Sequence, residues 1–242
     1  MSIPFSIVIP TYNEADGIEK LLRALVAVFH THGLDGEIIV VDDNSPDGTG
    51  DVVERLSREL PVRCLHRGGK LGLSSAVIDG WRFARSESVA LGAMDADFSH
   101  DVNALPKMVQ ALESGEYGLA VGSRYVPGGG IANWPLHRVI TSRVACWLAR
   151  PLTRVKDVTS GYFLVQRDAL AGARLDPIGF KIGLEVIVKA RYGKAVEIPY
   201  VFTDRVAGTS KLNEKEILNY LKQLGRLYAA WLVPPVAEER KA

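Results

Sequence analysis

Residues 37–45, EIIVVDDNS, decide the fold class of this chain. The segment EIIVV at 37–41 is apolar almost throughout, which is typical of a parallel strand that helices cover on both faces. Polar residues follow it directly, and in open α/β sheets ligands bind beyond the carboxyl ends of the strands. The stretch therefore predicts a buried strand with a binding site at its end.

The same kind of alternation continues over residues 1–125. Short β-branched runs are separated by segments whose apolar residues recur at helical spacing, which is typical of βαβ units around a mostly parallel sheet. The pattern predicts a doubly wound α/β fold. The expected strands cover residues 6–9, 37–41, 62–65, 89–94 and 118–122, and the expected helices cover 18–29, 52–56, 76–81 and 105–112.

The second half of the chain is less regular. The run PGGG at 127–130 predicts a flexible joint, because glycines have no side chain to hold them in place. The last helix is expected to end before Pro234 and Pro235, which cannot continue it. The remaining expected elements are helices around 144–152 and from about 216 to 232, and strands at 162–165 and 195–202.

Composition and length exclude several classes of protein. The net charge of +1 argues against a nucleic-acid binder with a globally basic surface. Cys64 and Cys146 have no metal-ligand spacing and are too few for a disulfide framework, which suits a reducing cytosol. Neither a signal peptide nor an apolar run of about 18 residues is present, so no bilayer-spanning helix is expected. The length of 242 residues predicts one domain over 1–235 and a tail at 236–242.

Carboxylates gather at the ends of three of the expected strands. The clusters are PTYNE at 10–14, DDNS at 42–45 and DAD at 95–97. Like charges at one edge of a sheet repel one another unless a cation or hydrogen-bond donors balance them. Hard oxygen ligands suit Mg²⁺ or Mn²⁺, which bind one or two protein carboxylates together with substrate phosphates.

Asp95 and Asp97 point to the same side of an extended backbone, as a shared metal site requires. The alternative is that Asp97 or Ser99 caps the helix expected at Leu105, and spacing alone leaves both interpretations open. The sequence contains no GxGxxG after its first strand and no GxxxxGK[ST] loop. These absences argue against a dinucleotide-binding dehydrogenase and against an NTPase phosphate loop.

The chain resembles the inverting GT-A glycosyltransferases of family 2, and within them the dolichyl-phosphate and polyprenyl-phosphate mannose synthases. The resemblance extends from Ile7 to about Trp231, and its motifs occur in the same order along the chain. These motifs are VIPTYNE (8–14), VVDDNSPDGT (40–49), GKLGLSSA (69–76), MDADFSH (94–100), GSRYVPGGG (122–130), DVTSG (157–161) and DRVAGTSKL (204–212).

The resemblance implies a role for individual residues. The catalytic metal, Mg²⁺ or Mn²⁺, is expected on Asp97 and on the side chain of Ser99, although some relatives carry glutamine at the latter position. The acceptor phosphate is expected at Arg124, Arg138 and Ser142, because arginine binds phosphate in a bidentate manner. The nucleotide sugar is expected at Pro10, Tyr12, Glu14, Val41, Asp43, Asp95, Ala96, Lys181 and Lys211.

The expected catalytic residues are Asp97, Arg124, Arg205 and Asp157. Asp157 resembles the base of relatives that use hydroxyl acceptors. A lipid phosphate is already largely dianionic at neutral pH, since its second pKa is about 6, and therefore needs no strong base. With such an acceptor, the alternative roles of Asp157 are to orient the sugar or to hold a loop.

The resemblance implies transfer of mannose from GDP-mannose to a dolichyl or polyprenyl phosphate with inversion, with 1–125 binding the nucleotide sugar and 126–235 the acceptor. The alternatives are UDP-glucose as donor, a sugar hydroxyl as acceptor, a non-catalytic nucleotide-sugar-binding subunit or a membrane scaffold. A prenyl acceptor places the enzyme at the cytoplasmic face of a membrane, by peripheral contact or through a membrane partner subunit. Some relatives carry C-terminal transmembrane helices, and this chain instead ends in AEERKA.

Two segments are expected to reach the membrane, 144–155 and the last helix, because both combine an apolar, tryptophan-bearing stripe with basic residues. We favour 144–155, which follows Arg138 and Ser142. The alternative is that these stripes pack into the core of the protein.

Overall fold

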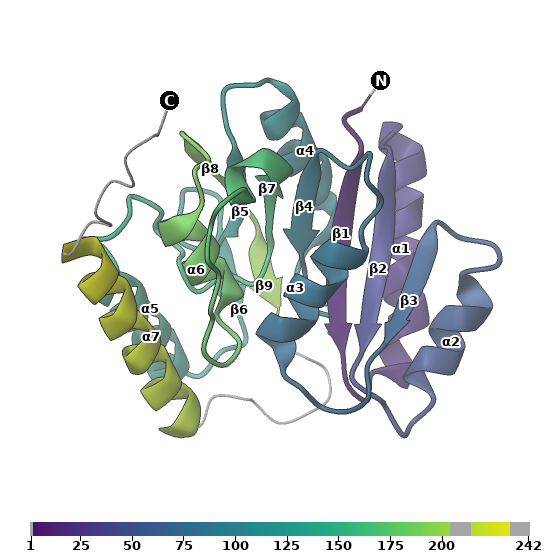
Figure 1. Cartoon of the computed structure of the whole chain (residues 1–242), viewed down its shortest axis with the longest axis horizontal. Helices are drawn as coiled ribbons and strands as arrows, with labels where there is room; N and C mark the ends of the chain where they lie inside the picture. Colours follow the sequence, from purple (N-terminus) through teal and green to yellow (C-terminus); the bar gives the residue numbers. More distant parts are fainter. Residues whose placement is uncertain (1, 204–213, 233–242) are drawn as a thin grey trace, which may run out of the picture.

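The computed structural model describes residues 2–203 and 214–232. A seven-stranded sheet in the order β3-β2-β1-β4-β7-β5-β8 forms its centre (Figure 1). All neighbouring strands are parallel except β7, which is antiparallel to both β4 and β5. The strands are β1 (Phe5–Thr11), β2 (Gly36–Asp42), β3 (Val62–His66), β4 (Ala90–Ala93), β5 (Leu119–Ser123), β7 (Phe163–Gln166) and β8 (Ala195–Pro199). The predicted mostly parallel α/β fold is confirmed.

Helices cover both faces of this sheet, as the apolar strands require. Ile7 and Ile9 point into the core on the side of α1 (Ala15–His32), whereas Val8 between them points to the other side. The first face is covered by α1, α2 (Thr49–Leu56) and α4 (Leu105–Glu113). The second face is covered by α3 (Leu73–Phe83) and α6 (Ile182–Lys189), together with parts of α5 (Leu136–Leu148) and α7 (Glu214–Leu232). The sequence pattern did not predict α6.

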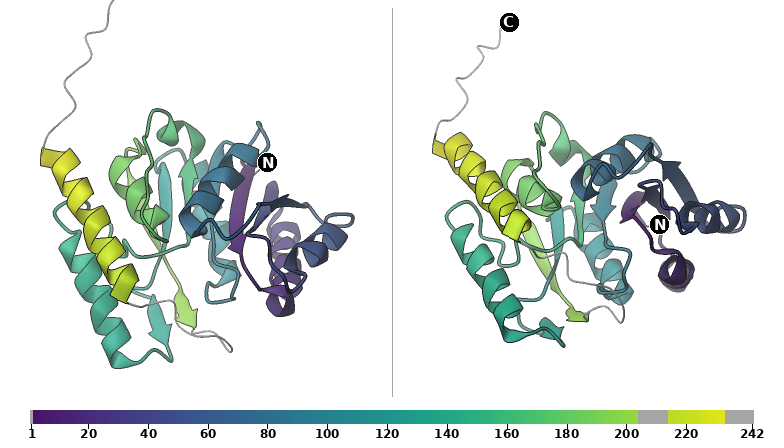
Figure 2. Two further views of the ribbon diagram at one scale, coloured as in Figure 1. Left: turned by 60° about the horizontal axis from the view of Figure 1, so that its bottom comes forward. Right: turned by 90° about the horizontal axis from the view of Figure 1, so that it is seen from below.

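Helices α5 and α7 lie side by side at one end of the molecule in both further views (Figure 2). Two tyrosines of α7 tie them together. Tyr220 donates its hydroxyl to the carbonyl of Ala145 at 2.6 Å, and Tyr228 donates to that of Leu148 at 2.6 Å. Helix α5 begins eight residues before the expected 144–152 segment, so Arg138 and Ser142 both lie on it. Among the described residues, no helix combines the length and apolarity needed to cross a bilayer.

The chain leaves the main sheet at Tyr200. Its amide donates to the Ser123 carbonyl of β5 at 3.2 Å, while its own carbonyl accepts from the Gly130 amide at 3.1 Å. Gly130 begins β6 (Gly130–Ala132), which pairs in parallel with β9 (Val201–Thr203). The single strand expected at 195–202 is therefore two strands in two sheets.

The glycine run at 127–130 forms a tight turn between β5 and β6. A Cβ atom on Gly129 would lie 2.5 Å from the Ser123 carbonyl oxygen, closer than such atoms can approach. Gly128 has a φ of 87°, in the left-handed region that glycine adopts without strain. The run is thus a packed turn, where we expected a flexible joint, and it leads from β5 into β6 and then to α5.

Candidate active site

A cavity of about 300 Å³ opens where β1, β4 and β5 end, beneath α5 and α7. Its wall combines acidic residues from the strand ends with basic residues from α5 and from the segment before α6. Most of the predicted site residues meet here. They are Pro10, Glu14, Asp95, Ala96, Asp97, Arg124, Arg138, Ser142 and Lys181.

Three predicted nucleoside contacts lie beside this cavity and not in its wall. Val41 is fully buried in the core against α3. Tyr12 is half-buried, and the Lys70 ammonium lies 4.0 Å from the centre of its ring. Asp43 is buried, pairs with Arg67 at 2.8 Å, and accepts the amides of Leu71 and Gly72. Asp43 thus ties the 67–72 loop to the end of β2.

The turns after β1 and β2 are cross-linked by Asp42 and Ser45. The Asp42 carboxylate accepts from the Ser45 amide at 3.0 Å and from the Thr11 hydroxyl at 3.2 Å. The Ser45 hydroxyl in turn accepts the amide of Asn13 at 3.0 Å. Asp42, one of the carboxylates at the strand ends, therefore has its hydrogen-bond donors within the protein.

Asp95 is held by a buried histidine. One ring nitrogen of His100, Nε2, lies 3.2 Å from Asp95 Oδ2, and the other, Nδ1, lies 2.8 Å from the Tyr200 hydroxyl. His100 is 3% exposed and packs among the rings of Tyr162, Tyr200 and Phe202. Because both of its nitrogens have partners, the imidazole fixes one oxygen of Asp95 at the cavity wall.

The turn from Asp97 to Ser99 has features suited to a hard cation. The Ser99 amide donates to Asp97 Oδ1 at 3.1 Å. The Ser99 hydroxyl oxygen is buried and has no hydrogen-bond partner among the described residues, although buried hydroxyls normally have one. Phe98 between them has a φ of 57°, and such a conformation costs a bulky residue of the order of 1–3 kcal/mol. Asp97 lines the cavity whereas Ser99 does not, but the carboxylate and the hydroxyl are both oxygen donors of the kind that Mg²⁺ or Mn²⁺ prefers.

The capping interpretation of Asp97 and Ser99 is wrong. The first helical turn here is a 3₁₀ helix, η1 (Val102–Ala104), which leads directly into α4. Its cap is Asp101, whose carboxylate accepts the Asn103 amide at 2.9 Å. Neither Asp97 nor Ser99 is needed to begin the helix.

Arg124 and Asp157 form a buried ion pair below the cavity. Arg124 donates from Nε at 2.7 Å, from Nη2 at 2.6 Å and from its backbone amide at 3.0 Å, all to the Asp157 carboxylate. Burial alone would raise the pKa of Asp157, but Arg124 outweighs that effect and holds the pKa below its ordinary value. Asp157 is fully buried and outside the cavity wall, whereas Arg124 reaches the wall. Asp157 orients Arg124.

A chain of hydroxyls extends this pair to α5. Arg124 Nη2 donates to the Thr159 hydroxyl at 2.7 Å, and Thr159 lies 3.2 Å from the Ser142 hydroxyl, which also accepts from Tyr125 at 2.8 Å. One turn earlier on α5, the Arg138 guanidinium stacks 3.9 Å from the centre of the Trp134 ring. These contacts aim Arg124 and Arg138 at the same cavity.

Lys181 adds a third cation. Its ammonium donates to the Thr159 carbonyl at 3.3 Å, and burial together with the charge of Arg124 lowers its pKa to about 8. The ammonium is therefore still mostly protonated at neutral pH. Arginine and lysine cations thus face carboxylates within one cavity.

The far wall of the cavity is apolar. Helices α5 and α7 contribute most of it, and the segment before α6 adds Phe180. The apolar residues are Val144, Ala145, Leu148, Phe180, Ile217 and Leu221. An elongated ligand with one anionic end and one hydrocarbon end matches this division.

The fold is that of glycosyltransferases that use nucleotide sugars. The chain superposes on glucosyl-3-phosphoglycerate synthase of Mycobacterium tuberculosis with a TM-score of 0.67, at 18% identity over 94% of this chain and 79% of that one. It also superposes on a mannosyltransferase of Pyrobaculum calidifontis, solved with GDP-Man and Mn²⁺, with a TM-score of 0.64, at 17% identity over 96% of this chain and 65% of that one.

Residues 6–172 match the model of glycosyl transferase family 2, and the chain belongs to this family. It is 41% identical to the dolichol-phosphate mannosyltransferase of Pyrococcus furiosus over 92% of its own length and 63% of that protein's. It is 37% identical to the enzyme of the same name in Saccharomyces cerevisiae over 94% of its own length and 88% of the yeast protein's.

Two predicted residues, Arg205 and Lys211, lie outside the described residues. Sequence reasoning also missed several residues of the cavity wall, namely His100, Trp134, Thr159 and Tyr200. His100 and Thr159 lie inside the MDADFSH and DVTSG motifs, so the signal was present but no role had been given to them. Trp134 and Tyr200 have no motif, and only the fold brings them to the site.

Proposed function

We propose that this chain transfers mannose from GDP-mannose to a dolichyl or polyprenyl phosphate, with inversion at the anomeric carbon and release of GDP. The observation that carries the proposal is the division of a single cavity into a carboxylate end, a cationic centre and an apolar wall. The relatives named dolichol-phosphate mannosyltransferase support mannose as the sugar and a prenyl phosphate as the acceptor.

The donor is proposed to bind at the strand ends. The nucleoside lies along Pro10, Tyr12 and Glu14, with Val41 and Asp43 forming the floor and Asp95 and Ala96 reaching the ribose and diphosphate. Asp97 and Ser99 hold Mg²⁺ or Mn²⁺. When bound, such an ion compensates the negative charge that develops on the departing diphosphate. The Mn²⁺ in the Pyrobaculum calidifontis complex supports a divalent ion in this role.

The acceptor phosphate is proposed to bind between Arg124, Arg138 and Ser142. Arg124 is already oriented by Asp157, so little reorganisation is needed when the phosphate arrives. Lys181, with a pKa of about 8, supplies a further positive charge at neutral pH. Lys181 and Lys211 are proposed to contact the diphosphate of the nucleotide sugar, and Arg205 to complete the phosphate contacts.

The reaction is a single displacement. A phosphate oxygen of the acceptor attacks the anomeric carbon, the bond from that carbon to the β-phosphate oxygen of GDP breaks, and both electrons leave with GDP. The acceptor is largely dianionic at neutral pH, because its second pKa is about 6, so no proton has to be removed. Asp157 then serves to position Arg124 and not as a base, since both of its oxygens already accept from Arg124.

The prenyl tail is proposed to leave the cavity along the wall between α5 and α7. Helix α5 carries exposed apolar residues at helical spacing, with Leu136, Ile140 and Trp147 on its outer face, Trp147 at 71%, and Val144 at the rim of the cavity. The alternative that Trp147 packs into the core is wrong for this residue. We propose that this face contacts the cytoplasmic surface of a membrane, with nearby arginines meeting anionic headgroups. In this arrangement 1–125 mainly serves the donor and 126–235 the acceptor, with Arg124 and Lys181 as exceptions at the boundary between the two sites.

A panel of donors and acceptors tests the proposal. GDP-mannose and UDP-glucose are each offered with a short polyprenyl phosphate, with the matching polyprenol and with a soluble sugar, in EDTA, Mg²⁺ or Mn²⁺. We expect turnover with GDP-mannose and polyprenyl phosphate in the presence of a divalent ion. Turnover only with UDP-glucose, only with a hydroxyl acceptor, or undiminished in EDTA would each overturn a separate part of the proposal.

A further inference from the structure

A second group of potential metal ligands lies away from the cavity, where α2 packs on β3. Cys64 and His66 are two residues apart on β3, so their side chains point to the same face of the strand. Glu54 reaches them from α2. The carboxylate oxygen, the thiol sulfur and a ring nitrogen all lie within 4.8 Å of one another. His66 Nε2 is 3.1 Å from Glu54 Oε1. None of the three lines the active-site cavity.

The His66 ring packs closely against the backbone of α2 at Gly50. A Cβ atom on Gly50 would lie 2.6 Å from Cε1 of His66, so only glycine lets the ring approach the helix this closely. On its other side, β3 is held in register with β2, where His66 pairs with Asp42 and Cys64 with Val40. The ring and the thiol are therefore carried on a fixed strand, and less order has to be gained when a ligand binds.

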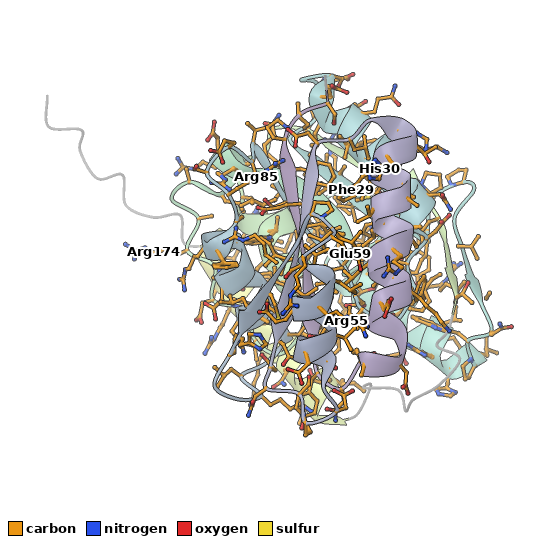
Figure 3. All side chains as sticks on the ribbon, turned by 90° about the vertical axis from the view of Figure 1, so that its right-hand side faces the viewer. Phe29, His30, Arg55, Glu59, Arg85 and Arg174 are labelled. Atoms are coloured by element: carbon orange, nitrogen blue, oxygen red, sulfur yellow. The ribbon has the colours of Figure 1, made fainter. Side chains whose placement is uncertain are left out.

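The surroundings of the cluster are negative. The carboxylates of Glu54, Asp42 and Asp51 all lie close enough to the Cys64 thiol to act on it electrostatically. The neighbouring Arg55 is directed away, toward α1, where it pairs with Glu19 at 2.6 Å (Figure 3). A group of carboxylates around the site attracts a cation.

We propose that Glu54, Cys64 and His66 form a binding site for a borderline divalent ion such as Zn²⁺. Thiolate, imidazole and carboxylate are the usual zinc ligands, and three protein ligands leave a fourth position for water. The hard ions expected at Asp97 prefer oxygen donors alone, so the two sites differ in selectivity. This site does not depend on the proposed transferase activity.

The position of the site suggests how an ion there would affect the chain. His66 is followed by Arg67, which pairs with the buried Asp43. Asp42, the residue of β2 that lies opposite His66, accepts the hydrogen bonds that order the turn after β2. An ion that joins α2 to β3 would therefore restrain the segments behind the nucleoside end of the active site. Since the unfolded chain lacks this geometry, binding should raise the melting temperature, by an amount that grows with the logarithm of the ion concentration divided by its Kd.

The test is titration of the full, EDTA-dialysed chain with Zn²⁺ by calorimetry, in a background of excess Mg²⁺ that occupies the oxygen site. Co²⁺ serves as a spectroscopic probe, because coordination by a thiolate gives an intense charge-transfer absorption. We expect one bound Zn²⁺, a higher melting temperature and the cobalt–thiolate band. Cys64→Ser and His66→Ala should each weaken Zn²⁺ binding by about tenfold or more.

Cys146 provides the matched control, because it is the other cysteine of the chain and is buried beside Asp157. Cys146→Ser should keep both the Zn²⁺ affinity and the cobalt band. Should Cys64→Ser fail to fold, Glu54→Gln replaces it, since the Glu54 side chain is exposed at 52%. Absence of binding, or equal Zn²⁺ affinity and an unchanged cobalt–thiolate band in Cys64→Ser, would overturn the proposal.

Discussion

Replacing Asp157 by asparagine tests the ion pair that positions Arg124. The substitution keeps the size of the side chain but removes its charge, and an asparagine amide turns N–H groups toward a guanidinium that can only donate. Arg124 is 7% exposed and Asp157 fully buried, so water cannot replace the lost acceptor. Removing one partner of a buried ion pair costs about 3–5 kcal/mol. For a chain of this size, that corresponds to a melting temperature lower by roughly 6–20 °C.

The assay is urea unfolding followed by circular dichroism, with an exposed ion pair as the matched control. Arg226 and Asp176 form a 3.2 Å pair whose side chains are 63% and 83% exposed, so Asp176→Asn should change the free energy of unfolding by less than about 1 kcal/mol. If Asp157→Asn lies within about 1 kcal/mol of the wild type, the buried pair is not what orients Arg124.

The pH dependence of the same pair gives a second readout. The pKa of Asp157 is lowered in the folded chain from an ordinary value of 3.8. Above about pH 4 the ion pair therefore contributes its full stabilisation of the folded state. The stabilisation is lost as the pH falls through the lower, folded pKa. The difference in unfolding free energy between wild type and Asp157→Asn should therefore be constant near neutral pH and shrink below about pH 4. A difference independent of pH would contradict the assignment.

Three further substitutions probe the cavity and the outer face of α5. Arg138→Ala should raise the acceptor KM or lower kcat by the equivalent of about 1.5–3 kcal/mol, while the affinity for GDP, measured by calorimetry, stays unchanged. An equal loss of GDP binding would place Arg138 in the donor site. Trp147→Glu should weaken sedimentation with anionic liposomes but not the fold, whereas Val89→Glu, at another exposed apolar position, should leave sedimentation unchanged. Binding of the wild type to the liposomes should weaken as the salt concentration rises. If neither Trp147→Glu nor salt changes liposome binding, the exposed face of α5 is not the membrane-binding surface. His100→Asn should raise the KM for GDP-mannose by about tenfold, with a smaller effect on kcat, because it releases Asp95; a fall in kcat at unchanged KM would contradict that role.

The sequence alone determined the layers of the fold and the edge at which the site lies. A strand such as 37–41 is apolar on both sides, and only a sheet between two layers of helices buries both. Parallel strands bring their carboxyl ends to one edge, so the clusters after β1, β2 and β4 had to meet there. The motifs then supplied the chemistry of Asp95 and Asp97, because these residues follow their strand directly.

Contacts between distant segments were decided only by the tertiary structure. Strand β7 runs antiparallel between β4 and β5, and no local pattern reports the direction in which a strand enters a sheet. The same insertion carries the DVTSG motif beneath Arg124, so that Asp157, which the resemblance offered as a base, becomes buried and fully occupied by the arginine. His100 meets Tyr200 across 100 residues because the chain changes sheets at Tyr200.

The group of Glu54, Cys64 and His66 was invisible in the sequence for a similar reason. Its cysteine and histidine are two residues apart on a strand, a spacing that matches no established metal motif. The third member comes from the helix that packs on that strand, and helix packing is set by the shapes of both surfaces. Sequence patterns specify which residues are buried and where strands end, whereas the pairing of side chains across elements depends on packing that only the folded chain defines.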